Sequence, residues 1–216
     1  MSLFLLLKDE LSGFIRSKVM ALLFIGMPLV AVLMFFLSPD LGGMQLGAFT
    51  ALTISSMAGL LASTTLAVSI INERTQGVFD LYLVRPVKRS HLVLAKYIAV
   101  IVSVMTAAAF ALVVANAYDW AAQGGFDLGS MMEPMLIIVT MTSLSCAVAV
   151  LVGTLVRSVL LGVILTIYGG NQLSAVIVLT SLENILSTEA ATLVGLTVAA
   201  IVLGAACYLF VRKVSS

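Results

Sequence analysis

Residue types that carry covalent or metal chemistry are few in this sequence. His91 is the only histidine, and the two cysteines, Cys146 and Cys207, both fall inside apolar stretches. A nucleophilic triad needs a base beside its nucleophile, and a metal site needs several convergent ligands. We therefore expect no catalytic residue, no metal ligand and no cofactor bound by this chain.

Methionine is the one soft ligand present in number. Met131, Met132, Met135 and Met141 gather near one end of an apolar segment. Thioether sulfur suits Cu(I), but methionine is also ordinary apolar filling. Because no cysteine or histidine lies beside the four, we interpret them as packing residues and keep a copper site as the alternative.

The densest group of charged residues lies in segment 72–96, which reads NERTQGVFDLYLVRPVKRSHLVLAK. A helix arriving from the N-terminal side can continue through Glu73 and Arg74. It is expected to end at Gly77, because glycine adopts the left-handed C-cap conformation without steric cost. We expect Glu73 to anchor this turn through a salt bridge or a backbone N–H. Ser90 is the expected N-cap of the next helix.

A short amphipathic piece follows this glycine. Residues 78–84 include the apolar Phe79, Leu81 and Leu83, and Pro86 ends the piece because proline lacks an N–H and disfavours helix in the residue before it. Arg89, close behind, is expected to meet an acidic partner surface or, alternatively, anionic lipid headgroups. The pattern predicts a short helix within a loop of residues 72–93. This helix would lie across the end of the bundle, between the two longer helices that the loop connects.

The elements that hold this loop follow from composition. Hydrophobic residues make up 62% of the 216 residues, charged residues 10%, and the mean hydropathy is +1.20. A soluble domain is about 45–50% apolar and about 25% charged. Such a chain cannot cover itself in water, and its hydrophobicity excludes intrinsic disorder. The net charge of +1 excludes a broadly basic nucleic-acid binder. The composition indicates an integral membrane protein with no nucleic-acid partner.

Ionised residues divide the chain into six apolar intervals, each long enough for the roughly 20 residues that cross a bilayer. Runs such as Val148 to Val152 do not alternate in polarity as barrel strands do. We predict an all-α polytopic membrane protein, with one transmembrane domain over residues 1–216. The six expected spans are 19–37, 48–71, 94–118, 135–156, 159–180 and 192–211.

The charges separate by side. Every Lys and Arg falls on the side that holds both termini and the 72–93 loop. The charged residues on the opposite side are all acidic, namely Asp40, Asp119, Asp127, Glu133, Glu183 and Glu189. The positive-inside rule then makes the basic side and both termini cytoplasmic.

Residues 1–18 show helical periodicity of their own. One face carries apolar residues, namely Phe4, Leu7, Leu11, Phe14 and Ile15. A basic start, which a signal peptide requires, is missing because the apolar run comes first. We expect an amphipathic helix in the membrane interface, with a frayed extension of the first span as the alternative.

Polar residues inside the spans are candidates for a substrate pathway. Asn171 and Gln172 follow a glycine pair in the fifth span, and Ser56 and Thr64 lie in the second. Polar groups at membrane depth are costly, so they face a cavity or a bundle interior. They could line a pathway or mark a break in the helix. They could equally serve as hydrogen-bonding or small packing residues between helices.

The order of these features resembles the permease subunits of ABC type-2 transporters. Their usual signature is an ERExGT-like start, a leucine-rich short helix, a PVSR-like turn and a lysine that opens the third span. The matching residues are Glu73-Arg74-Thr75-Gln76-Gly77-Val78, Leu81-Tyr82-Leu83, Pro86-Val87-Lys88-Arg89 and Lys96. Thr75, Val78 and Lys88 depart from the signature.

The resemblance implies an ATP-driven exporter whose coupling helix, matching Val78 to Arg89, sits in a groove of a separate ATPase. It assigns ATPase coupling to the matching positions, among them Glu73, Arg74 and Gly77. ATP and Mg would bind at that partner, because this chain has no Gly-x-x-x-x-Gly-Lys-Ser/Thr loop. The resemblance also implies a second permease copy, normally forming a homodimer, and fits a prokaryotic inner membrane.

A stand-alone carrier or channel is the rival interpretation. Ion-coupled carriers commonly contain intramembrane ionisable residues or repeated halves with broken helices. The six apolar intervals, of which the third begins after Lys96, contain no charged residue, and no clear repeat is visible. A membrane scaffold is a third interpretation, for which the sequence offers no positive sign.

Overall fold

The computed structural model describes residues 3–37, 46–77, 89–123, 132–183 and 185–214. Within these ranges the chain forms helices and no strand. The elements are α1 (Leu3–Ile15), α2 (Lys18–Leu37), α3 (Leu46–Thr75), α5 (Arg89–Gln123), α6 (Met132–Leu155), α7 (Val159–Leu165), η3 (Thr166–Asn171), α8 (Gln172–Leu182) and α9 (Thr188–Val214). The all-α prediction is confirmed.

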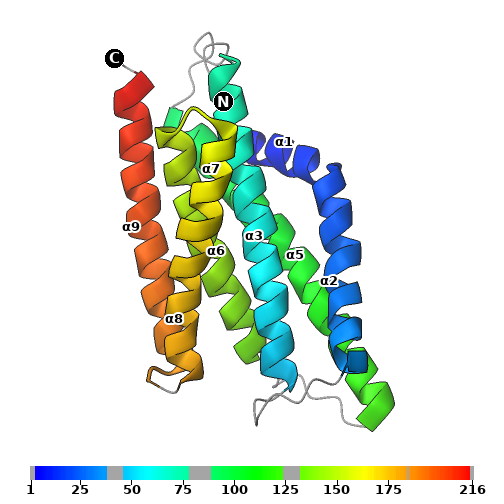
Figure 1. Ribbon diagram of the computed structural model, residues 1–216. Coiled ribbons are helices and arrows are strands. Elements are labelled where there is room, and N and C mark those ends of the chain that lie inside the picture. The colour runs from blue at the N-terminus through cyan, green and yellow to red at the C-terminus, as the bar shows by residue number, and fades with distance from the viewer. Residues whose placement is uncertain (1–2, 38–45, 78–88, 124–131, 184, 215–216) are drawn as a thin grey trace.

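The long helices run side by side, and α1 lies across one end of the bundle (Figure 1). Five helical segments are long and apolar enough to cross a membrane, with α7, η3 and α8 counted together. The pair α1 and α2 passes the same test when joined, which gives up to six spans, but it bends by 61°. This bend contradicts the alternative that α1 is a plain extension of the first span.

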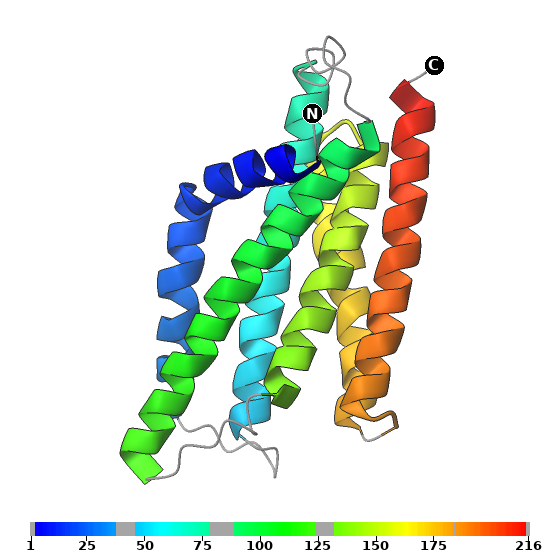
Figure 2. The same cartoon turned by 180° about the vertical axis from the view of Figure 1, so that it is seen from behind.

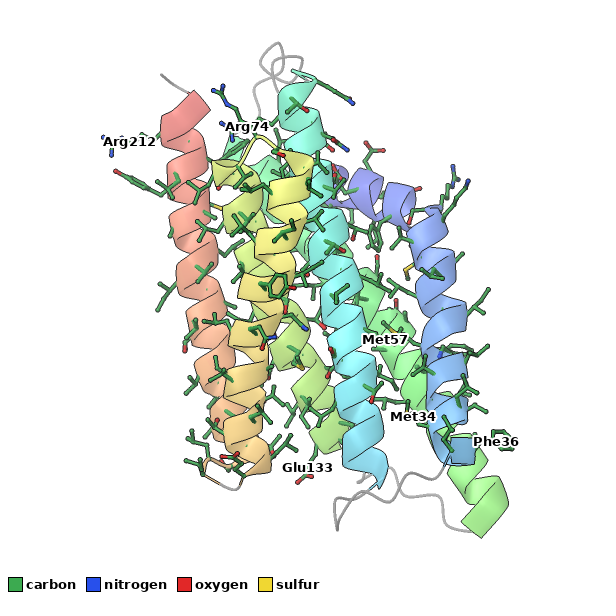
Figure 3. The ribbon with its side chains drawn as sticks, in the orientation of Figure 1. Met34, Phe36, Met57, Arg74, Glu133 and Arg212 are labelled. Atoms are coloured by element: carbon green, nitrogen blue, oxygen red, sulfur yellow. The ribbon has the colours of Figure 1, made fainter. Side chains whose placement is uncertain are left out.

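One end of the bundle gathers α1, the C-terminal ends of α3 and α9, and the N-terminal end of α5 (Figures 1 and 2). The labelled side chains follow the predicted separation of charge. Arg74 and Arg212 lie at this end, whereas Glu133 lies at the other (Figure 3).

The core centres on α3 and α6, which pack along most of their length. In the most apolar window of α6, 67% of residues are buried, against 28% for the α7–α8 segment and 22% for α9. The large side chains Ile54, Ile70 and Ile138 are fully buried. Small residues permit this close approach, since a Cβ on Gly153 would stand 3.1 Å from Ile70. Helices α7 to α9 therefore present most of their surface outward.

Hydroxyl groups along α3 mostly bond to their own helix. The Oγ1 atoms of Thr64 and Thr65 donate to the Leu60 and Leu61 carbonyls at 2.7 and 2.8 Å. Ser55 Oγ likewise donates to the Leu52 carbonyl at 2.9 Å, and it also lies 3.1 Å from the Met141 sulfur on α6. Satisfied hydroxyls let two helices approach closely without stranding a polar group in lipid.

Candidate functional site: a charged junction at one end of the bundle

A buried lysine joins three helices at the basic end. Lys96 on α5 is only 7% exposed, and its Nζ lies 2.6 Å from Oε1 of Glu73 on α3. The same Nζ lies 2.9 Å from Oε1 of Glu10 on α1. It also donates to Ser69 Oγ at 3.4 Å, and Ser69 in turn donates to Glu73 Oε1 at 3.2 Å. We call these four residues the charged junction.

Local structure explains how the junction forms. Ser69 and Glu73 stand four residues apart, so both lie on one face of α3. Lys96 falls two turns into α5, where an ammonium among apolar neighbours needs anionic partners. Glu10 reaches it because α1 turns away from α2 and packs on α5. The ion pairs tie α1, α3 and α5 into one unit.

The end of α3 is held on a second side. Arg74 Nη1 donates to the carbonyl of Thr154 at 2.6 Å, in the last turn of α6, where carbonyls lack partners within their own helix. Gly77 then adopts φ 69°, the left-handed conformation predicted for the cap. Glu73 and Arg74 thus fix the point from which residues 78–88 leave α3.

The salt bridge expected for Glu73 is present, and its partner is Lys96. Phe79, Leu81, Leu83 and Pro86 lie outside the described residues, as does the side chain of Arg89, so their coupling roles stay predictions. Ser90 is not the N-cap. The helix α5 already begins at Arg89, which places Ser90 inside its first turn.

The fifth span runs without interruption from Val159 to Leu182, and where Asn171 and Gln172 could have marked a break it changes its helical winding instead. Residues Thr166–Asn171 form a π-helical segment, the wider helix that often occurs at functional positions. Gly170 packs on α6, where a Cβ would stand 3.2 Å from the Ser145 carbonyl oxygen. Ser145 Oγ lies 3.0 Å from Ser174 Oγ, a pair that the sequence analysis missed. Hydroxyl groups of α6 and α8 therefore meet inside the bundle next to the π-helical segment.

The four pathway candidates are not brought into one cluster. Asn171 Oδ1 is buried without a hydrogen-bond partner among the described residues, and it faces the Gly59 position on α3. Gln172, its neighbour, is exposed. Ser56 and Thr64 are half-buried on α3, and Thr64 bonds to its own helix. Among these four candidates, Asn171 alone has a buried side-chain oxygen without a partner in the described part of the chain, a property that Ser103 and Thr142 share.

The charged junction also holds a residue that sequence reasoning did not single out, namely Glu10. The sequence signal that could have identified the junction is Lys96, because a lysine next to a long apolar run requires a counter-ion. Within the described part of the chain, no group of three His, Cys, Asp or Glu residues could hold a metal ion.

A family model described as "ABC-2 family transporter protein" matches residues 6–172. The matched region begins in α1 and ends at the first residue of α8, so it contains every member of the charged junction. A search of individually curated proteins gave no match.

Proposed function

This chain belongs to the ABC-2 family of transporter membrane proteins, and from that premise we propose that it is the permease subunit of an ATP-driven exporter. The ATPase, with its ATP and Mg, is a separate chain that docks on residues 78–89. Two permease copies form the substrate pathway. The protein lies in the inner membrane of a prokaryote, with both termini in the cytoplasm.

The charged junction is the observation that carries this proposal. Residues 78–88 connect α3 to α5, and the Glu73–Lys96 ion pair ties these two helices together next to that connection. A force applied to the segment reaches both helices at once. Glu10 adds α1 to the same unit, and α1 leads through its bend into α2. Closure of the ATPase pair would therefore move α1, α3 and α5 as one lever.

The exposed face of the fifth span supports the pairing of two copies. Gln172 is exposed there, and Tyr168 on the same segment is 68% exposed. An amide at membrane depth is costly against lipid but is satisfied beside a second helix bundle or a water-filled pathway. This segment faces the second copy or the pathway between the copies.

The test is capture of the ATPase by the tagged, full-length chain from native membranes. Leu81→Asp combined with Leu83→Asp should abolish ATPase capture and ATP-dependent transport while membrane insertion stays normal, because charge replaces the apolar face of the docking helix. Arg157→Ala is the control, since Arg157 is exposed in the turn between α6 and α7, outside the 72–93 loop. Normal capture and transport by the doubly substituted protein would show that this segment does not couple to an ATPase.

A further inference from the structure

A cavity lies in the angle between α1 and α2, next to the charged junction. Its volume is about 190 Å³, and α1, α2, α3 and α5 all contribute to its wall. A water molecule occupies about 30 Å³ of liquid, so the space would hold about six waters or one small polar headgroup. Glu10, Ser69 and Lys96 form its polar side, and Phe14, Leu66 and Val100 belong to its apolar side.

The polar side of this cavity offers acceptors rather than donors. Lys96 carries three N–H groups, and its contacts go to Glu10, Glu73 and Ser69. Each carboxylate keeps further lone pairs after these contacts. The junction holds two carboxylates and one ammonium, so its formal charge is negative, and of the two carboxylates that of Glu10 lines the cavity. An anionic ligand would have to displace existing ion pairs, whereas a cationic donor would complete them.

A ligand in the cavity can reach the carboxylate of Glu10 more easily than the ammonium of Lys96. The Glu10 side chain is 30% exposed, whereas that of Lys96 is 9% exposed. Arg16 and Lys18 are exposed at the bend between α1 and α2. These two basic residues do not line the cavity, so a ligand whose ammonium meets Glu10 would reach them only with a phosphate that extends out of it.

The position of the cavity indicates where the ligand comes from. Helix α1 lies across the end of the bundle, and Phe4 and Ile15 on it are strongly exposed, as expected for a helix resting on acyl chains. The apolar side of the cavity would accept the part of a lipid below its headgroup. A primary ammonium donates three hydrogen bonds to carboxylates, whereas the quaternary ammonium of choline has no N–H to donate.

We propose that this cavity binds the ethanolamine headgroup of a phospholipid, with the ammonium at Glu10 and the phosphate toward Arg16 and Lys18. The bound lipid bridges α1 to α3 and α5 and holds the charged junction closed. This site does not depend on the identity of the transported substrate or of the ATPase.

The experiment is native mass spectrometry of the full-length protein in detergent, titrated separately with phosphatidylethanolamine, phosphatidylcholine and phosphatidylglycerol. The wild-type protein should bind the ethanolamine lipid at least about tenfold more tightly than the other two lipids. This difference in affinity corresponds to the free energy of one hydrogen bond to a charged group. Glu10→Gln should remove this preference. Asp9→Asn is the matched control, because Asp9 is an exposed acid on the same helix that does not line the cavity.

Ala99→Leu keeps every charge and fills the cavity, so it should weaken binding of the ethanolamine lipid as well. Thermal unfolding without added lipid would confirm that each variant is folded. Equal affinity of the wild-type protein for the three lipids would overturn the proposal, as would an unchanged preference in folded Glu10→Gln or Ala99→Leu. ATPase capture by the wild-type protein is measured separately, so failure here leaves the proposed function standing.

Discussion

Replacing Lys96 by methionine should destabilise the protein more than removing all the charges around it. Methionine keeps most of the apolar length of lysine but leaves Glu10 and Glu73 facing each other without a counter-ion. Removing one partner of a buried ion pair costs about 3–5 kcal/mol. The two carboxylate side chains are 30% and 24% exposed, so water relieves part of this repulsion. We expect a loss near the lower end, about 3 kcal/mol.

The matched comparison is the triple variant Lys96→Met, Glu10→Gln, Glu73→Gln. Replacing a whole buried ion-pair group by neutral residues of similar size is often close to neutral. The triple variant should therefore recover most of the stability that the single variant loses. Reversible unfolding in mixed detergent micelles, followed by circular dichroism, measures both differences in the free energy of unfolding.

Stability and coupling should separate in these variants. The triple variant is expected to fold and bind the ATPase but to transport poorly, because α1, α3 and α5 are no longer tied together. If Lys96→Met alone unfolds like the wild-type protein, the ion pairs carry no structural energy. A triple variant as unstable as the single one would show that the loss comes from packing rather than from charge.

Two further predictions concern the 72–93 loop and the π-helical segment of the fifth span. Arg89→Ala should lower the affinity for the ATPase by at least about tenfold, as truncating a desolvated interface charge does. Arg157 is exposed at the turn between α6 and α7, and Arg157→Ala should change the affinity for the ATPase little. Both affinities are measured in one detergent at one salt concentration. Equal, small losses of affinity for the two variants would show that Arg89 only contacts lipid headgroups. Gly170→Ala should cost about 1–3 kcal/mol through overpacking, because its Cβ would press on the Ser145 backbone. Gly169→Ala should change the free energy of unfolding little, since its Cβ would meet only Val148 at 3.9 Å. Thermal unfolding of both variants measures the difference. Similar losses of stability in the two variants would contradict the close packing of Gly170 in the π-helical segment.

Local signals in the sequence predicted much of this fold. Apolar intervals between charges locate the membrane helices, because the bilayer fixes their length and excludes ionised groups. The end of α3 was predictable from Gly77, since a single residue type favours the left-handed cap that the structure contains. The bend between α1 and α2 also agrees with the separate helix expected for residues 1–18.

The charged junction depends on tertiary geometry and could not be predicted as a unit. Glu10 and Lys96 lie 86 residues apart in sequence and meet only because α1 turns back over α5. Glu73 was expected to find some partner, but the sequence alone could not choose between a salt bridge and a backbone N–H. The π-helical segment was not predictable either, because the polar residues Asn171 and Gln172 left a break in the helix as one alternative and did not indicate that Gly170 would pack on Ser145.

The order of the junction residues along the chain bears on how the protein is made. Glu10 and Glu73 both precede Lys96, so both carboxylates have been synthesised before the lysine of the third membrane helix emerges. A lysine at the centre of an inserting helix costs about 2.5–3.5 kcal/mol, and one near the helix end costs less because it can reach the interface. During synthesis from the N-terminus, both counter-ions of Lys96 therefore exist before its ammonium reaches the membrane. A chain that lacked its first helix would insert the same lysine with only Glu73 to meet it.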